Sequence, residues 1–123
     1  MTIAGIVVAG AAGALARYGM TVLIGRSAAG SFPWATLFVN VSGSLVLGFL
    51  AAVFSDRLVP DAALRTALTV GFLGAYTTFS TFSLETFRLL QDGAASTALG
   101  YMLASVFAGL LAVYVGWVVG RAV

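Results

Sequence analysis

The chain has 123 residues, of which 61% are apolar and only 8% are charged, and its mean hydropathy is +1.08. A soluble domain carries roughly 25% charged residues and cannot bury this much apolar surface at such a length, so the solvent of that surface must be lipid. The net charge of +2 is too small for a nucleic-acid-binding surface, and the absence of Cys and His excludes disulfides, thiol chemistry and the usual haem or zinc ligands. The composition therefore predicts an all-α integral membrane protein.

Four apolar stretches are each long enough to cross about 30 Å of hydrocarbon as a helix. They cover residues 3–24, 34–54, 62–90 and 96–119, so we expect a single four-span membrane domain over residues 1–123. The first stretch is too long for a signal peptide and lacks a basic segment before it. An even number of spans places both termini on the same side of the membrane.

Arginines are divided almost equally between the two ends of these predicted helices. The end with the termini has Arg57, Arg65 and Arg121, and the other end has Arg26 and Arg88, with Arg17 close to it. The positive-inside rule orients a chain by such a difference, which here is close to zero. The count is compatible with weakly biased insertion in one orientation, or with insertion in both, which would give an antiparallel, dual-topology homodimer.

Small residues recur every four positions on the first and fourth predicted helices. They are Gly5, Ala9 and Gly13 on the first, and Ala112, Gly116 and Gly120 on the fourth. Such spacing lets helix backbones approach closely in lipid, either within one subunit or between two. Because four helices leave little interior space and the chain has no internal repeat, a conduction path would need a second copy.

Polar side chains form two stripes at membrane depth. The second helix carries Thr36, Asn40, Ser44 and Gly48, and the fourth carries Thr97, Tyr101, Ser105 and Gly109. Such groups are costly in hydrocarbon unless they are paired, so they face protein or a hydrated path, although Ser and Thr can also bond to their own helix. Asn40 is the only Asn in the chain, and its amide cannot be satisfied in that way. Neutral donors without a carboxylate suit an anion better than a cation.

The third predicted helix contains residues that weaken a helix in its middle. Gly71 and Gly74 precede a run of Ser and Thr at positions 77–83 that also holds Phe79 and Phe82. We therefore expect a break near residues 74–80, and broken helices at membrane depth commonly form ion sites. The positive edges of the two rings can meet a small anion, although a Phe pair also serves plain packing.

Three stretches of the sequence resemble the Fluc (CrcB) family of fluoride channels. They are residues 10–18 (GAAGALARY), 36–44 (TLFVNVSGS) and 71–85 (GFLGAYTTFSTFSLE), and the last is the most specific. The resemblance covers essentially the whole chain. It implies an antiparallel homodimer with two fluoride pathways and a structural Na⁺ at its centre.

The same resemblance implies roles for individual residues. Phe79 and Phe82 would be the paired rings of the pathway, and Asn40 would be its amide donor. The polar track would include Thr81, Ser83, Tyr101 and Ser105, with Gly109 where such a track often has one more hydroxyl. The backbone carbonyls of Gly74 and Thr77 would bind Na⁺, and Arg17 and Glu85 would lie near the pore mouths.

The function predicted from these features is a fluoride-selective passive channel of the cell (inner) membrane, which lowers cytoplasmic fluoride by letting it leave. One alternative is a proton-coupled small multidrug exporter, but that chemistry needs a carboxylate deep in the first helix, where this chain has none. Another alternative is a membrane assembly protein that transports nothing. An enzyme is not expected, because no His, Cys or paired carboxylates supply an acid, base or nucleophile.

Overall fold

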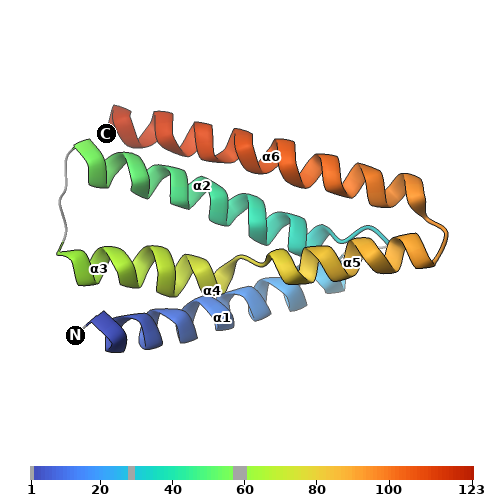
Figure 1. Cartoon of the computed structure of the whole chain (residues 1–123), viewed down its shortest axis with the longest axis horizontal. Helices are drawn as coiled ribbons and strands as arrows, with labels where there is room; N and C mark the ends of the chain where they lie inside the picture. The colour runs from blue at the N-terminus through green and yellow to red at the C-terminus, as the bar shows by residue number, and fades with distance from the viewer. Residues whose placement is uncertain (1, 28–29, 57–60) are drawn as a thin grey trace.

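A computed structural model describes residues 2–27, 30–56 and 61–123 of the chain. Its elements are α1 (Thr2–Ser27), α2 (Trp34–Asp56), α3 (Ala62–Thr66), the π-helix η1 (Ala67–Leu73), α4 (Gly74–Tyr76), α5 (Phe79–Gln91) and α6 (Ala95–Ala122). The described residues contain no strand. The chain runs alternately in opposite directions, so the N- and C-termini lie at the same end of the molecule (Figure 1). Arg57 lies outside the described residues.

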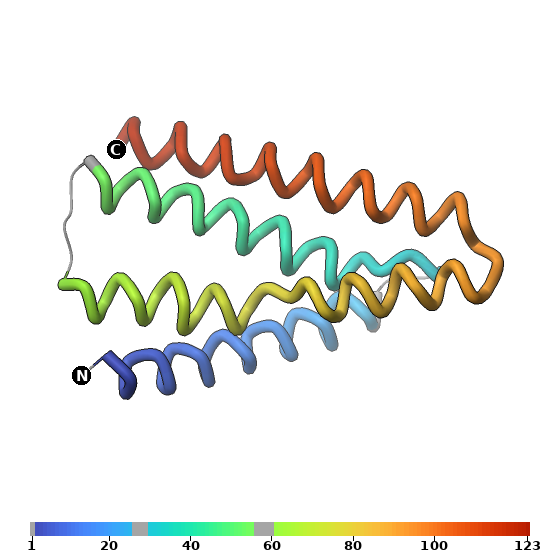
Figure 2. The backbone as a smooth tube through the Cα atoms, viewed as in Figure 1, coloured from blue at the N-terminus to red at the C-terminus, as the bar shows by residue number. Residues whose placement is uncertain are grey.

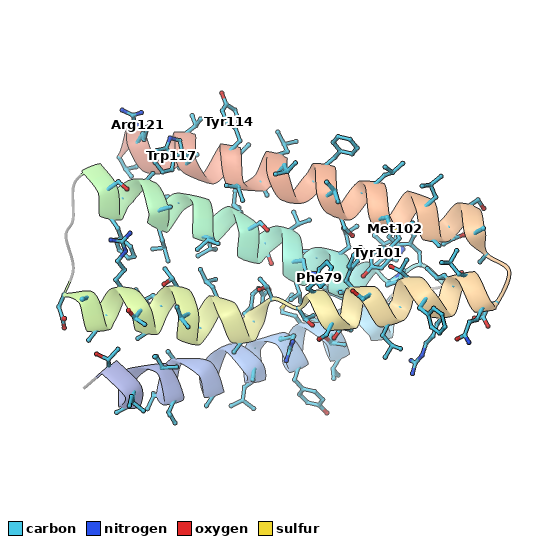
Figure 3. The ribbon with its side chains drawn as sticks, in the orientation of Figure 1. Phe79, Tyr101, Met102, Tyr114, Trp117 and Arg121 are labelled. Atoms are coloured by element: carbon cyan, nitrogen blue, oxygen red, sulfur yellow. The ribbon has the colours of Figure 1, made fainter. Side chains whose placement is uncertain are left out.

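Three of the described helices are long and apolar enough to cross a membrane: Thr2–Gly25, Trp34–Ser55 and Ala95–Ala122. The segment expected to be a further span is divided into α3, η1, α4 and α5, and α5 with its 13 residues reaches only about 20 Å. These four elements nevertheless follow one another along a single line (Figure 2). Large apolar side chains cover the outside of the bundle, including Tyr114, which points away from it on α6 (Figure 3). This is the surface of a multi-pass membrane protein.

The helices pack mainly as two pairs, α1 with η1 and α4, and α2 with α6. Glycines make both contacts close. A Cβ atom on Gly116 would overlap the carbonyl oxygen of Leu45 on α2, and one on Gly13 would overlap that of Phe72 in η1. At these positions the predicted small-residue stripes therefore pack helices within one subunit.

Gly116→Ala is expected to destabilise the protein by about 1–3 kcal/mol, the usual cost of overpacking, because the methyl group meets rigid backbone of α2. Gly100→Ala is the matched control on the same helix, where no atom lies within 4 Å of the added methyl group. It should leave stability unchanged or raise it by up to about 1 kcal/mol. Thermal unfolding of both variants in detergent measures the difference, and equal midpoints would contradict this packing.

Two residues between α4 and α5 leave the helical conformation. Thr77 has φ −81° and ψ 160°, and Thr78 has φ −152° and ψ 117°. The sequence did not indicate that the seven residues before α4 form a π-helix. Within it, Gly71 packs on α1, where a Cβ atom would come within 3.1 Å of Ala9. The candidate site is built around the two extended residues.

Candidate functional site

Thr78 is bound by hydrogen bonds to two elements, α2 and α5. The Asn40 amide pairs with both of its backbone groups: Thr78 N donates to Asn40 Oδ1 at 2.8 Å, and Asn40 Nδ2 donates to Thr78 O at 3.0 Å. The Thr78 hydroxyl oxygen accepts from Thr81 N at 3.2 Å and so caps the start of α5. Asn40 therefore secures the extended backbone from α2 while Thr78 begins the next helix.

These bonds leave two carbonyl groups without their helical donors. In a continuous helix, Thr78 N would donate to Gly74 O, and Thr81 N would donate to Thr77 O. Both N–H groups are diverted to side chains, and neither of the two backbone bonds forms. The two carbonyls belong to the residues for which a cation-binding role is predicted.

A cleft of about 300 Å³ lies beside these carbonyls, between α2 and the line of elements from η1 to α5. Its lining includes Gly74, Thr77, Asn40 and Ser44. Hard monovalent and divalent cations prefer oxygen ligands, and neutral carbonyls that lack a donor are available for them. The groups present therefore fit a small cation such as Na⁺.

The two predicted pathway rings start α5 and differ in exposure. Phe79 is 80% exposed in the single chain, whereas Phe82 is half-buried, and their ring centroids are 5.6 Å apart. Phe82 also packs on Tyr101, with ring centroids 5.1 Å apart, and Phe32 and Tyr101 form a T-shaped pair with centroids 5.5 Å apart. Figure 3 shows Phe79 and Tyr101 on the same side of α5, toward α2 and α6. Phe79 is thus a large apolar side chain that the single chain leaves uncovered.

Glu85 is bound by hydroxyl groups from two other helices. Thr36 donates to its Oε1 atom at 2.8 Å, and Tyr101, which is fully buried, donates to its Oε2 atom at 2.7 Å. Both bonds are charge-assisted when the carboxylate is ionised. Because Tyr101 has a single O–H, this arrangement leaves its oxygen only as an acceptor toward any further ligand.

The remaining predicted track residues differ in how their hydroxyls are used. Ser83 donates to Phe79 O on its own helix at 2.9 Å, the local bond that the sequence left open as an alternative. Thr81 is exposed and accepts from the Thr78 hydroxyl at 3.0 Å. The Ser105 hydroxyl is buried and has no hydrogen-bond partner in the structure. Ser105 therefore presents an unused donor one helical turn from Tyr101.

Arg17 lies in a second cleft, of about 350 Å³, between α1, α2 and α5. Glu85, Thr36 and Thr81 line the same cleft. No ion pair joins Arg17 and Glu85, and the hydroxyls of Thr36 and Tyr101 take the place of a cation beside the carboxylate. The two residues predicted near the pore mouths thus face one polar cleft without pairing.

The structure brings the predicted residues together in two groups. Asn40, Gly74, Thr77 and Phe79 line the cleft at the break, and Tyr101, Phe82 and Glu85 form a cluster between α5 and α6. Sequence reasoning assigned no role to Thr78, which pairs with Asn40 of the first group and caps the start of α5. The sequence feature that could have indicated this role is a Thr at the start of a helix, since Thr is a common N-cap residue whose side chain accepts the N–H three residues later.

The sequence was compared with known proteins. Residues 4–117 match the family described as "CrcB-like protein, Camphor Resistance (CrcB)". A protein of Magnetococcus marinus named fluoride-specific ion channel FluC is 49% identical over 121 residues, which cover 98% of each chain. One of the same name from Methylobacterium sp. is 50% identical over 113 residues, covering 92% of this chain and 90% of the relative. Fluoride-specific ion channel FluC 2 of Geobacillus kaustophilus is 44% identical over 110 residues, covering 89% and 85%.

Proposed function

The chain belongs to the CrcB-like family, and from this premise we propose that it is a fluoride-selective channel through which fluoride leaves the cell passively. The observation that carries the proposal is the close identity, over nearly the whole chain, to proteins named fluoride-specific ion channels. The site agrees in its chemistry, because neutral donors and aromatic rings surround the break. The family contains channels, so an enzymatic role has no support.

The proposed architecture has four crossings and two chains. The elements α3, η1, α4 and α5 together would make the crossing that none of them makes alone, because they continue along one line (Figure 2). Two copies would insert in opposite orientations into the inner membrane and pair as an antiparallel homodimer. The exposed Phe79 ring and the open cleft at the break support a partner on that face.

The proposed pathway replaces the water shell of fluoride a few contacts at a time, as carbonyl groups do for cations in other filters. Asn40 has one N–H beyond the one that it gives to Thr78, and Ser105 has an unused hydroxyl. The edges of Phe79 and Phe82 would supply positive potential between such donors. Thr81 and Ser83 would line the same route, and Tyr101 would line it with its ring, since its hydroxyl donates to Glu85. Arg17 and Glu85 would lie at its ends. A narrow slot between packed rings would reject larger halides.

A structural Na⁺ would lie at the centre of the dimer. Two carbonyls per chain, from Gly74 and Thr77, would provide four oxygens around a twofold axis. When bound, the cation would supply positive charge that balances the aligned carbonyl dipoles of the two breaks. The diverted N–H groups of Thr78 and Thr81 support this assignment, because they keep both carbonyls available.

The competing transport function is a proton-coupled small multidrug exporter. Its exchange of protons for drug requires a carboxylate in the first helix, and α1 contains no Asp or Glu. Glu85 is the acid nearest to mid-depth, and it is already bound by two hydroxyls. We therefore expect downhill flow of fluoride without proton coupling.

Efflux from liposomes tests the function. Pure protein in vesicles loaded with fluoride should release it when an ionophore balances the charge, while vesicles loaded with chloride should retain their anion. An assembly protein that transports nothing would release neither ion. An exporter would instead require a proton gradient and a cationic drug.

A further inference from the structure

We propose that Asn40 is a positioning residue for the cation site: by accepting the N–H of Thr78, it prevents that N–H from closing the helix onto Gly74 O. The inference rests on the proposed Na⁺ site and concerns a role for Asn40 beyond that of an anion donor. It starts from the two hydrogen bonds that the Asn40 amide makes with one residue of the break.

The Thr78 N–H has two possible acceptors in this fold. One is Gly74 O, its ordinary helical partner, and the other is Asn40 Oδ1, which it uses at 2.8 Å. A backbone N–H buried at membrane depth must be paired, because leaving it bare costs several kcal/mol. If the side-chain acceptor is removed, the acceptor that requires the smallest rearrangement is Gly74 O, since it lies four residues away on the same chain. The carbonyl would then be occupied by a hydrogen bond and be a poorer cation ligand.

The two polar atoms of Asn40 therefore have separable tasks. Oδ1 holds the break open, and Nδ2 pairs with Thr78 O and retains a second N–H. Asn40 itself lines the cleft shared with Gly74 and Thr77. A substitution that keeps an acceptor but loses the donors should spare the cation site. One that loses both should weaken it.

The test measures how the thermal stability of the purified protein in detergent depends on Na⁺, with a large organic cation replacing Na⁺ at constant ionic strength. Na⁺ binding to the folded state raises stability by RT ln(1 + [Na⁺]/Kd), so the rise of stability with Na⁺ concentration yields an apparent Kd, which is the half-saturation concentration and is called the midpoint below. Asn40→Leu has a similar shape without polar atoms and should raise this midpoint about tenfold, the effect expected from one competing hydrogen bond. Asn40→Asp keeps an acceptor oxygen and should leave the midpoint at or below that of the parent, even where fluoride flux is lost.

Ser42→Ala is the matched control, because it also removes a hydrogen bond between α2 and the elements beside the break. Ser42 lies on α2 and hydrogen-bonds the Tyr76 hydroxyl on α4 at 2.9 Å, without contacting the Thr78 N–H. Its loss should lower the unfolding temperature at all Na⁺ concentrations and leave the midpoint within about twofold. If Asn40→Leu fails to fold, Asn40→Ala removes the same acceptor and takes its place.

A second readout reports on Thr78 directly. Thr77 and Thr78 are the only adjacent pair of threonines in the chain, so threonine labelled with ¹³C and ¹⁵N gives one carbonyl–amide correlation in NMR spectra. This signal should shift with Na⁺ at the stability midpoint in the parent and at the higher midpoint in Asn40→Leu.

Three results would overturn the inference. The first is a stability of the parent protein that does not depend on Na⁺ concentration. The second is an equal change of the Na⁺ midpoint in Asn40→Leu and Ser42→Ala. The third is a midpoint of Asn40→Asp raised as much as that of Asn40→Leu. Fluoride efflux of the parent is measured separately. A parent that binds Na⁺ but does not conduct fluoride would refute the proposed channel, while the midpoints would still decide the role of Asn40.

Discussion

Phe82→Ile should reduce fluoride efflux at least about tenfold while the protein still folds and forms the proposed dimer. Phe82 packs between Phe79 and Tyr101, with ring centroids 5.6 Å and 5.1 Å away. Isoleucine fills much of the same space but has no positive ring edge to offer an anion. A tenfold drop corresponds to about 1.4 kcal/mol in the barrier, which is close to the strength of one aromatic contact.

Phe87→Ile is the control for this substitution. Phe87 lies on the same helix and is 56% exposed, so the change removes a ring of the same kind from outside the Phe79–Tyr101 cluster. It should conduct like the parent. The comparison measures fluoride efflux from liposomes with equal protein content, and gel filtration of each variant checks the proposed dimer. If Phe82→Ile conducts as Phe87→Ile does, the rings do not line the pathway.

A tag or single cysteine at the C-terminus should be labelled from both sides of the membrane in similar amounts. The reason is the near balance of arginines between the two ends of the bundle, which leaves the positive-inside rule little to act on. Gln91→Lys with Ser96→Lys adds two charges to the end opposite the termini, where both residues are exposed. This variant should be labelled almost entirely from one side and lose most of its fluoride efflux, because no chain of the other orientation is present.

Two further variants make the test specific. Gln91→Lys with Ser55→Lys adds the same charge but divides it between the ends, so it should keep mixed labelling and activity. Thr2→Lys with Ser55→Lys biases insertion the other way. Co-expression of this variant with the doubly substituted Gln91 and Ser96 variant should restore efflux. One-sided labelling of the unmodified chain would refute the antiparallel dimer.

The sequence by itself determined the environment and the helical class of the chain. A run of about 20 apolar residues has one stable form in lipid, because the backbone must satisfy its own hydrogen bonds, and this rule needs no tertiary contact. The weak-helix residues from Gly71 to Ser83 likewise pointed to residues 74–80, and the structure places the extended residues at Thr77 and Thr78. The family could be recognised for a related reason, since its most specific motif is contiguous along the chain.

Only the tertiary structure decided which polar groups meet. Asn40 pairs with Thr78, 38 positions away, and Thr36 pairs with Glu85, 49 positions away. In a soluble protein an amphipathic pattern tells which helix face meets the core. In lipid most of every helix face is apolar, and the polar stripe on α2 does not say which element it meets. The rotation of each helix follows from close backbone contacts, such as Gly116 against Leu45. Gly43 of α2 also lies against Thr77, where a Cβ atom would overlap the threonine methyl group. Beside it, Asn40 pairs with Thr78, and that pairing decides which carbonyls remain available.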